Sequence, residues 1–331
     1  MSGTNQFQPF AIGSGANALT PAAYAALSTL ISQGFQSGIA NSAQVNTVLR
    51  QASFMAAALG QVIANAGLNA NDDGTLSNMV AALQTVLVQK TQVVGAARNL
   101  RMSLTSASAS ATFTADEIVV ESALGGAAYQ LSGFSKVLNI GGTGAGGMDT
   151  GSAPVSGYVA VYAIYNPSTG ATSIIGVNAT SAIAPEIYGG SSMPSGYTAS
   201  ALISVWRTNS SGQFVVGSQV DRLIAFPDLQ AFTMDQLSVS SSISGSASIS
   251  GIVPKNAYSI FGSMKWSSLG GYTSFGYSFT GVNTVEIEGY ASYWSVPYSD
   301  LILASPQALT YGAGVGSSTF NFSLFIDGYR F

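Results

Sequence analysis

From Gly95 onward, apolar and polar residues alternate with a period of two, which is the spacing of extended chain rather than of helix. Such alternation places one side of a strand in a core and the other in water, so it predicts β-strands. Turn-forming stretches such as Asn166–Gly170 and Asn209–Gly212 separate them, and no alternation of strand with helix is visible. The pattern favours antiparallel sandwich or barrel-like domains. The predicted strands include Glu117–Glu121, Tyr158–Tyr165, Ile174–Val177, Ala199–Trp206 and Gln213–Val220.

The residues before Gly95 carry apolar side chains at helical spacing. Thr20–Pro21 indicates a helix start, because Thr can cap a helix and Pro fits its first position. A second helix is expected after Asn41 or Ser42, and a third over the apolar residues of Leu76–Leu87. Three short apolar helices suit a small monomeric bundle or an oligomeric collar.

The predicted fold class is mainly β with an N-terminal α-helical region and antiparallel β-sandwich-like middle and C-terminal domains. A boundary is expected at Phe226–Asp228, where Pro interrupts the strand pattern. The predicted domains are a helical N-terminal region at 1–95, a middle antiparallel β domain at 96–227 and a C-terminal β-rich domain at 228–331.

A serine-faced segment follows this boundary. Every even position from Ser238 to Ser250 is serine, while the odd positions are mostly apolar or small. On an extended chain this gives one dry face and one hydroxyl face, so we expect one strand, or two with a turn near Gly245. A flexible Ser/Gly linker is the competing interpretation. As a strand, the segment is expected to contact other copies of the chain.

Charged residues are scarce. Asp, Glu, Lys and Arg make up 7% of the 331 residues, against roughly 25% in ordinary soluble proteins. The ten basic residues form no run, so the positive surface of a nucleic-acid-binding protein is not expected. A surface with few charges is covered by Ser, Thr, Asn and Gln or buried against sister subunits, and we expect both.

Two residue types central to enzyme chemistry are missing, since the sequence has no Cys and no His. A Ser-His-Asp triad, a cysteine nucleophile, a disulfide framework and a His- or Cys-ligated zinc site are therefore excluded. We expect no catalytic residues, no metal and no cofactor, and a protein that acts through binding surfaces.

The segment Met1–Phe10 lacks the basic and apolar regions of a secretory signal. The longest apolar runs, such as Phe54–Leu59, fall far short of the ~20 residues that span a membrane. We therefore expect assembly in a cytoplasm and no membrane insertion.

Three motifs could carry chemistry, and each has a plainer interpretation that we favour. Glu286 and Glu288 share one strand face roughly 6.5–7 Å apart, within the range of paired glycosidase carboxylates, but two solvated glutamates would look the same. Gly141–Gly147 lacks the Lys and the following helix of a phosphate-binding loop, so we expect a tight loop. Asn69–Gly74 matches the EF-hand pattern only partly, because Val80 replaces the bidentate Glu, so we expect a solvated loop.

Aromatic residues are frequent from Trp266 to the C-terminus. The alternating Phe275 and Phe279 are expected in a core, and Phe331 is expected to be packed. Other aromatic residues adjoin Gly, Ser and Pro loops, where Tyr and Trp supply rigid contact area with a polar group. The candidate residues for binding at the surface are Trp266, Tyr272, Tyr290, Tyr293, Trp294 and Tyr298.

Three segments resemble tail fibre proteins of tailed bacteriophages and related prophages. Gln44–Phe54, followed by an Ala-rich helix, an Asp-Asp-Gly loop and another helix, is similar to the N-terminal part of such fibres. Gly144–Gly151 leading to Ser156–Pro167, and Tyr188–Trp206, are similar to a middle β-domain that recurs in them. The resemblance spans about residues 1 to 225, whereas the remaining residues resemble the family only as a variable β-rich tip.

The resemblance implies an elongated homotrimer in the virion. Its N-terminal end would attach to phage tail tip or baseplate proteins, and its C-terminal end would bind a host cell-surface glycan or protein receptor. No catalytic residues carry over. Two alternatives stay open: a fibre that cleaves host polysaccharide with acids such as Glu286, Glu288 or Asp300, and a purely structural baseplate or collar spacer.

Overall fold

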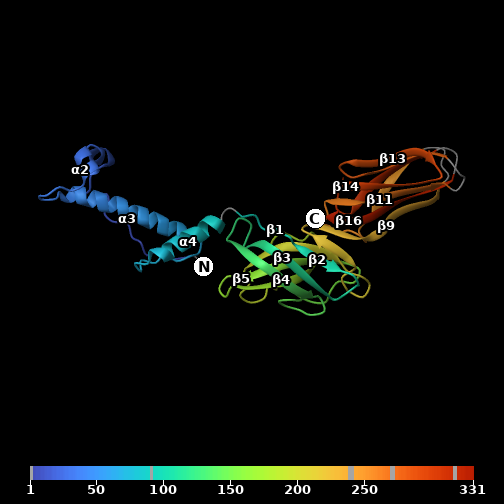
Figure 1. Cartoon of the computed structure of the whole chain (residues 1–331), viewed down its shortest axis with the longest axis horizontal. Helices are drawn as coiled ribbons and strands as arrows, with labels where there is room; N and C mark the ends of the chain where they lie inside the picture. Colours follow the sequence, from blue (N-terminus) through green and yellow to red (C-terminus); the bar gives the residue numbers. More distant parts are fainter. Residues whose placement is uncertain (1–2, 90–91, 238–241, 269–272, 316–318) are drawn as a thin grey trace. The chain divides into compact units, whose positions relative to one another are not determined.

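The computed structural model contains two compact units, Met1–Thr91 and Gln92–Phe331 (Figure 1). The chain is mainly β, as the alternation predicts, and every pairing between the named strands in the described residues is antiparallel. The structure describes residues 3–89, 92–237, 242–268, 273–315 and 319–331.

The first unit holds short helices and one long helix. The side chain of Thr20 accepts the amide of Ala23, and that of Asn41 accepts the amides of Ala43 and Gln44, so both cap residues act as predicted. The first expected helix is divided into two pieces. None of the helices in the described part of the chain is long and apolar enough to cross a membrane. The helices are α1 (Pro21–Ala25), α2 (Ser28–Gln33), α3 (Ser42–Asn65) and α4 (Leu76–Gln89).

The second unit begins with a curled sheet in which β3, β7, β5 and β6 follow one another and β4 flanks β3. β4 and β6 lie next to each other, and the glycine loop Gly141–Gly147, which follows β4 in the chain, bridges them through hydrogen bonds. The amide of Asn139 donates to Gly146, and the Gly146 amide donates to Ile174 at 2.7 Å. The strands are β1 (Ala97–Arg98), β2 (Arg101–Leu104), β3 (Ser110–Glu121), β4 (Ala128–Asn139), β5 (Tyr158–Asn166), β6 (Ala171–Asn178), β7 (Ala199–Arg207) and β8 (Gly217–Val220).

The remaining strands form two facing sheets. One has the order β14-β11-β16-β9 and continues through β8, and the other has the order β10-β15-β12-β13. Successive strands mostly alternate between the sheets, and the last strand lies beside the first, which is the jelly-roll arrangement of eight strands. The strands are β9 (Leu223–Leu237), β10 (Ile243–Ser248), β11 (Ser259–Ser268), β12 (Thr273–Thr280), β13 (Thr284–Ala291), β14 (Tyr293–Ile302), β15 (Ala308–Val315) and β16 (Phe320–Arg330).

Aromatic rings fill the space between these two sheets. Phe232 of β9 lies 4.6 Å from Tyr311 of β15, and Phe322 of β16 lies 5.1 Å from Tyr277 of β12, measured between ring centroids. Phe279 is buried, as the alternation predicts. Offset and tilted contacts of this kind add to the free energy gained from burying apolar area. The facing rings hold the two sheets together as a sandwich.

β9 continues from the curled sheet into the jelly roll, and the boundary predicted at Phe226–Asp228 lies inside this strand. One hydrophobic core runs through both parts. The buried Tyr329 hydroxyl donates to the Val205 carbonyl at 2.6 Å, and the Tyr158 hydroxyl donates to the Ser250 carbonyl at 2.8 Å. Phe331 is packed, as expected. Residues 92–331 therefore form a single compact unit.

The serine-faced segment is partly described, since residues 238–241 lie outside the described residues. In β10 the alternation is confirmed: Ser246 and Ser248 are exposed and Ala247 is buried. Gly245 pairs with Tyr311 inside the strand, so the turn proposed there is absent. β10 lies at the end of its sheet, with its hydroxyl face exposed. Contact with other copies stays a prediction.

Candidate functional site

Two of the six candidate aromatic residues, Trp266 and Tyr298, are buried. The Trp266 ring stacks 4.4 Å from Phe320 and 6.0 Å from Tyr277. The Tyr298 hydroxyl donates to the Phe325 carbonyl at 2.9 Å. The prediction of a surface position is therefore wrong for both, because the strand alternation turns these side chains toward the interior. Neither is placed to contact a receptor directly.

Tyr293 and Trp294 are exposed at the start of β14, the outermost strand of its sheet. Trp294 pairs directly with Trp266 across β14 and β11, so both indoles point to the same face of the sheet. Trp266 is 1% exposed and Trp294 is 43% exposed, since Trp294 lies at the rim of the sandwich. Tyr272 lies outside the described residues, and of Tyr290, in β13, only the backbone is described.

Glu286 and Glu288 both have exposed side chains on β13, while Val285 packs against the core. Their cross-strand partners are Ser278 and Gly276 of β12. A glycosidase pair needs two environments that separate the pKa values of acid and nucleophile. Two glutamates on one solvated strand face match the plainer interpretation.

The glycine loop uses its amides internally. Those of Gly142, Gly144 and Gly146 donate to the carbonyls of Asn139, Met148 and Ile174. A phosphate-binding loop needs such amides free, so the loop acts here as a connector between strands.

The acidic loop before α4 shows a similar internal use. Asp73 accepts the Thr75 amide at 2.8 Å and the Asn78 side-chain amide at 3.1 Å, and the Thr75 bond is the main cause that lowers the pKa of Asp73. The loop thus fastens the start of α4. Among the residues that the structure describes, no group of three or more acidic side chains is placed to hold a metal ion.

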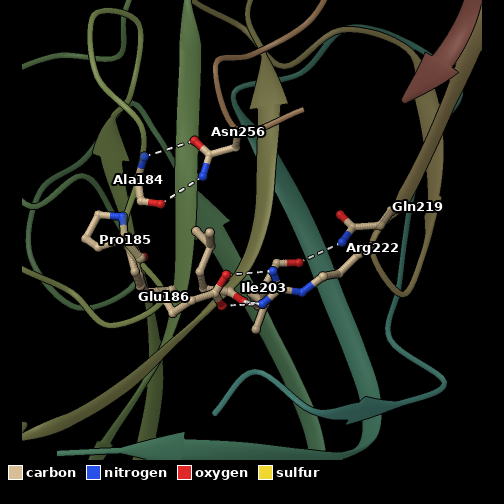
Figure 2. Close-up of polar contacts among 9 residues, drawn as sticks. Ala184, Pro185, Glu186, Ile203, Gln219, Arg222 and Asn256 are labelled. Carbon is tan, nitrogen blue, oxygen red and sulfur yellow. Dashed lines mark hydrogen bonds and ion pairs between the residues drawn. The ribbon is translucent and has the colours of Figure 1, made fainter. Parts of the chain in front are cut away.

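A groove in the second unit brings together polar residues that sequence patterns did not single out (Figure 2). It measures about 670 Å³. Arg222 forms a two-pronged ion pair with Glu186, with Nη1 donating to Oε1 at 2.9 Å. The side-chain amide of Asn256 donates to the Ala184 carbonyl at 2.8 Å and accepts the Ala184 amide at 2.9 Å. Tyr258 lines the groove and is exposed.

These polar groups bind one another, so they clamp the segment containing Ala184 and Glu186 against the jelly roll (Figure 2). Bidentate arginine–carboxylate pairs are geometrically specific. Glu186, Arg222 and Asn256 lie far apart in the sequence, and each lacks a local motif. No sequence pattern could therefore have identified the clamp.

A second polar cluster crosses three neighbouring strands of the jelly roll. Lys265 of β11 lies 2.7 Å from the Asp228 carboxylate and 3.5 Å from the centroid of the Phe325 ring. Partial burial, together with a hydrogen bond to Asp228, raises the pKa of Asp327, and Lys265 opposes this shift. The cluster ties β9, β16 and β11 together.

No protein-family model matches the chain, and no curated protein sequence matches it either. Among solved structures, a Cry1Da tryptic core variant from Bacillus thuringiensis is similar with 10% identity and a TM-score of 0.22, over 74% of this chain and 54% of that chain. The functional form of the mosquito-larvicidal Cry4Aa toxin from the same organism is similar with 8% identity and a TM-score of 0.22, over 75% and 55%. The chain thus spans about half the length of these structures. Likeness this weak assigns neither fold nor function.

Proposed function

We propose that the chain is a tail fibre protein of a tailed bacteriophage, carried in the virion as a homotrimer. Its helical N-terminal region attaches to tail tip or baseplate proteins, and its C-terminal jelly roll binds a glycan or protein on the host surface. The observation that carries the proposal is the eight-stranded jelly roll with Tyr293 and Trp294 exposed on its outermost strand. Viral capsid proteins and lectins use the same architecture, although architecture alone does not assign function.

The chemistry of this edge suits binding. Tyr293 and Trp294 are consecutive residues, so their side chains lie on opposite faces of β14. Each offers an apolar ring face with a polar group at its rim, which fits the apolar faces and hydroxyls of sugars. In such a chain, the scarcity of charge favours contact with neutral surfaces and burial between copies. We propose binding without catalysis, because the surface supplies rings rather than activated groups.

Cell binding by the labelled full chain tests the proposal. Flow cytometry over a panel of bacterial strains should find strains that bind, and Trp294→Ala and Tyr293→Ala should each weaken that binding at least tenfold. Lys136→Ala on β4, outside the jelly roll, serves as the matched control. Binding that both aromatic variants retain, or a chain that binds no strain, contradicts the proposal, and the second result favours a structural spacer.

A polysaccharide digest tests the alternative of cleavage. The full chain, incubated with capsule or lipopolysaccharide from a strain that it binds, should release no reducing ends. If the wild-type chain releases reducing ends and Glu286→Gln does not, the protein is a depolymerase and the proposal of binding without catalysis is wrong.

A further inference from the structure

The long helix α3 carries an apolar seam that its own unit leaves uncovered. Val48, Ala52, Met55, Leu59 and Val62 follow one another at alternating spacings of four and three residues. Met55 is 59% exposed, Leu59 44% and Val62 48%. Exposed apolar side chains are ordinary when scattered, but a continuous row along one helix indicates an interaction surface.

This seam is separate from the face that α3 buries within its own unit. The buried residues of the same half of the helix are Gly60, Ile63 and Ala64. At about 100° per residue, the two rows are centred roughly 110° apart around the helix axis. This half of the helix therefore has two apolar faces, of which the unit covers one.

The hydrophobic core of this unit is small. Its fully buried members are Ile63, Ala70 and Val86 among the described residues. A helix of 24 residues packed on so small a core gains little free energy from tertiary contacts. A second packing partner along the free seam would supply the missing burial.

The spacing of the seam identifies the kind of partner. Alternation of four and three repeats every seven residues and keeps a seam on one side of a supercoiled helix, which is the pattern of coiled coils. Arg50 is the sole charged residue of α3, and its guanidinium donates to the Leu19 carbonyl at 2.8 Å. A partner with complementary charge therefore has nothing to recognise, whereas a second copy presents the same apolar row.

One heptad of the seam has the residue types of assemblies with more than two helices. With Ala52 and Leu59 at the a positions, Val48, Met55 and Val62 fall at the d positions. Leu59 at a with Val62 at d is of the kind that favours three or four strands over two, whereas Ala52 and Met55 carry no such preference. In a closed ring of three copies the helices run parallel, because the threefold axis relates them.

We propose that α3 helices of three copies pack through this seam as a parallel coiled coil. The inference deepens the proposed function by naming the surface through which the copies associate. The number of copies, three, rests on the proposed function. The position of the seam rests on the heptad spacing of α3.

Light scattering of the full chain tests the seam. The wild-type protein should have three times the 33.7 kDa mass of one chain. Leu59→Glu places a charge in the seam of every helix and should weaken association at least a hundredfold, leaving monomer at micromolar concentration. Phe54→Glu is the matched control, since Phe54 is on the same helix, is 56% exposed and faces away from both apolar rows. A monomeric wild-type chain, or equal dissociation of both variants, overturns the inference.

A cross-linking experiment covers the case in which Leu59→Glu unfolds α3. The sequence has no cysteine, so a single introduced cysteine reports its own neighbours. Val62→Cys, at a d position, should form a disulfide between copies under mild oxidation, and Phe54→Cys should not. Equal cross-linking of both variants, or of neither, contradicts a parallel seam. Cell binding is measured separately: association without cell binding leaves the seam standing and removes the proposed function.

Discussion

Trp266 and Trp294 are direct cross-strand partners with opposite environments, so truncating each should have opposite consequences. Trp266 is 1% exposed and stacked between Phe320 and Tyr277, whereas Trp294 is 43% exposed at the rim. We expect Trp266→Ala to lower the stability of the jelly roll and Trp294→Ala to lower cell binding.

The magnitudes follow from burial. Replacing a fully buried Trp or Phe by Ala costs about 3–5 kcal/mol, because transfer free energy is lost and a cavity remains. Total stabilities are about 5–15 kcal/mol, so Trp266→Ala should remove a large part of the stability of the second unit. Trp294→Ala leaves no enclosed cavity and should cost about 1 kcal/mol or less.

Urea unfolding followed by near-ultraviolet circular dichroism measures both free energies of unfolding. Binding of the labelled chain to cells at low temperature measures function. Trp266→Phe should fall between wild type and Trp266→Ala, because it keeps a ring against Phe320. Equal destabilisation by the two alanine variants would refute the assignment of Trp266 to the core and Trp294 to the surface.

Three further predictions concern the jelly roll and its junction. Gly262→Ala places a methyl group against the Phe325 carbonyl, so its thermal midpoint should fall by an amount corresponding to about 1–3 kcal/mol or more. Asn256→Ala removes both hydrogen bonds to one backbone residue and should cost about 1–3 kcal/mol in urea unfolding. The pKa of Asp327 is raised in the fold, chiefly by burial and by Asp228. The folded protein therefore binds this proton more tightly than the unfolded chain does. The free energy of unfolding falls as pH rises through the raised pKa, because the carboxyl group becomes charged in a partly buried place. Asp327→Asn should therefore be more stable than wild type at neutral pH, with the difference disappearing toward pH 4 in a series of urea titrations.

Local features were predictable from sequence where one residue type determines the outcome. Asn41 and Thr20 cap helices because their side chains can accept exposed amides, whatever the tertiary structure. The strand predicted at Tyr158–Tyr165 forms β5, and the structure adds that it is buried on both faces from Tyr158 to Ile164. Alternating serines predict the exposed hydroxyl face of β10.

Features that depend on strand order were not predictable. Trp266 and Trp294 look equivalent in sequence, and their burial differs because β11 lies inside its sheet while β14 is outermost. Pro227 indicated a domain boundary because Pro cannot donate to a strand ladder. The structure accommodates it in β9 where the pairing with β16 shifts register beside Asp327, so the missing donor is tolerated.

The seam on α3 and the rim aromatics of the jelly roll predict a coupling between assembly and binding. A single Tyr293–Trp294 edge offers a small contact area, so each copy should bind weakly. Joining three copies makes later contacts intramolecular, which raises overall affinity by about 10²–10⁴ without new contacts. Leu59→Glu should therefore weaken cell binding by about that factor although the jelly roll is unchanged, and Trp294→Ala should weaken binding without changing the mass in solution. A monomeric Leu59→Glu variant that binds cells as tightly as the assembled chain would show that one edge suffices, and the argument from avidity would be lost.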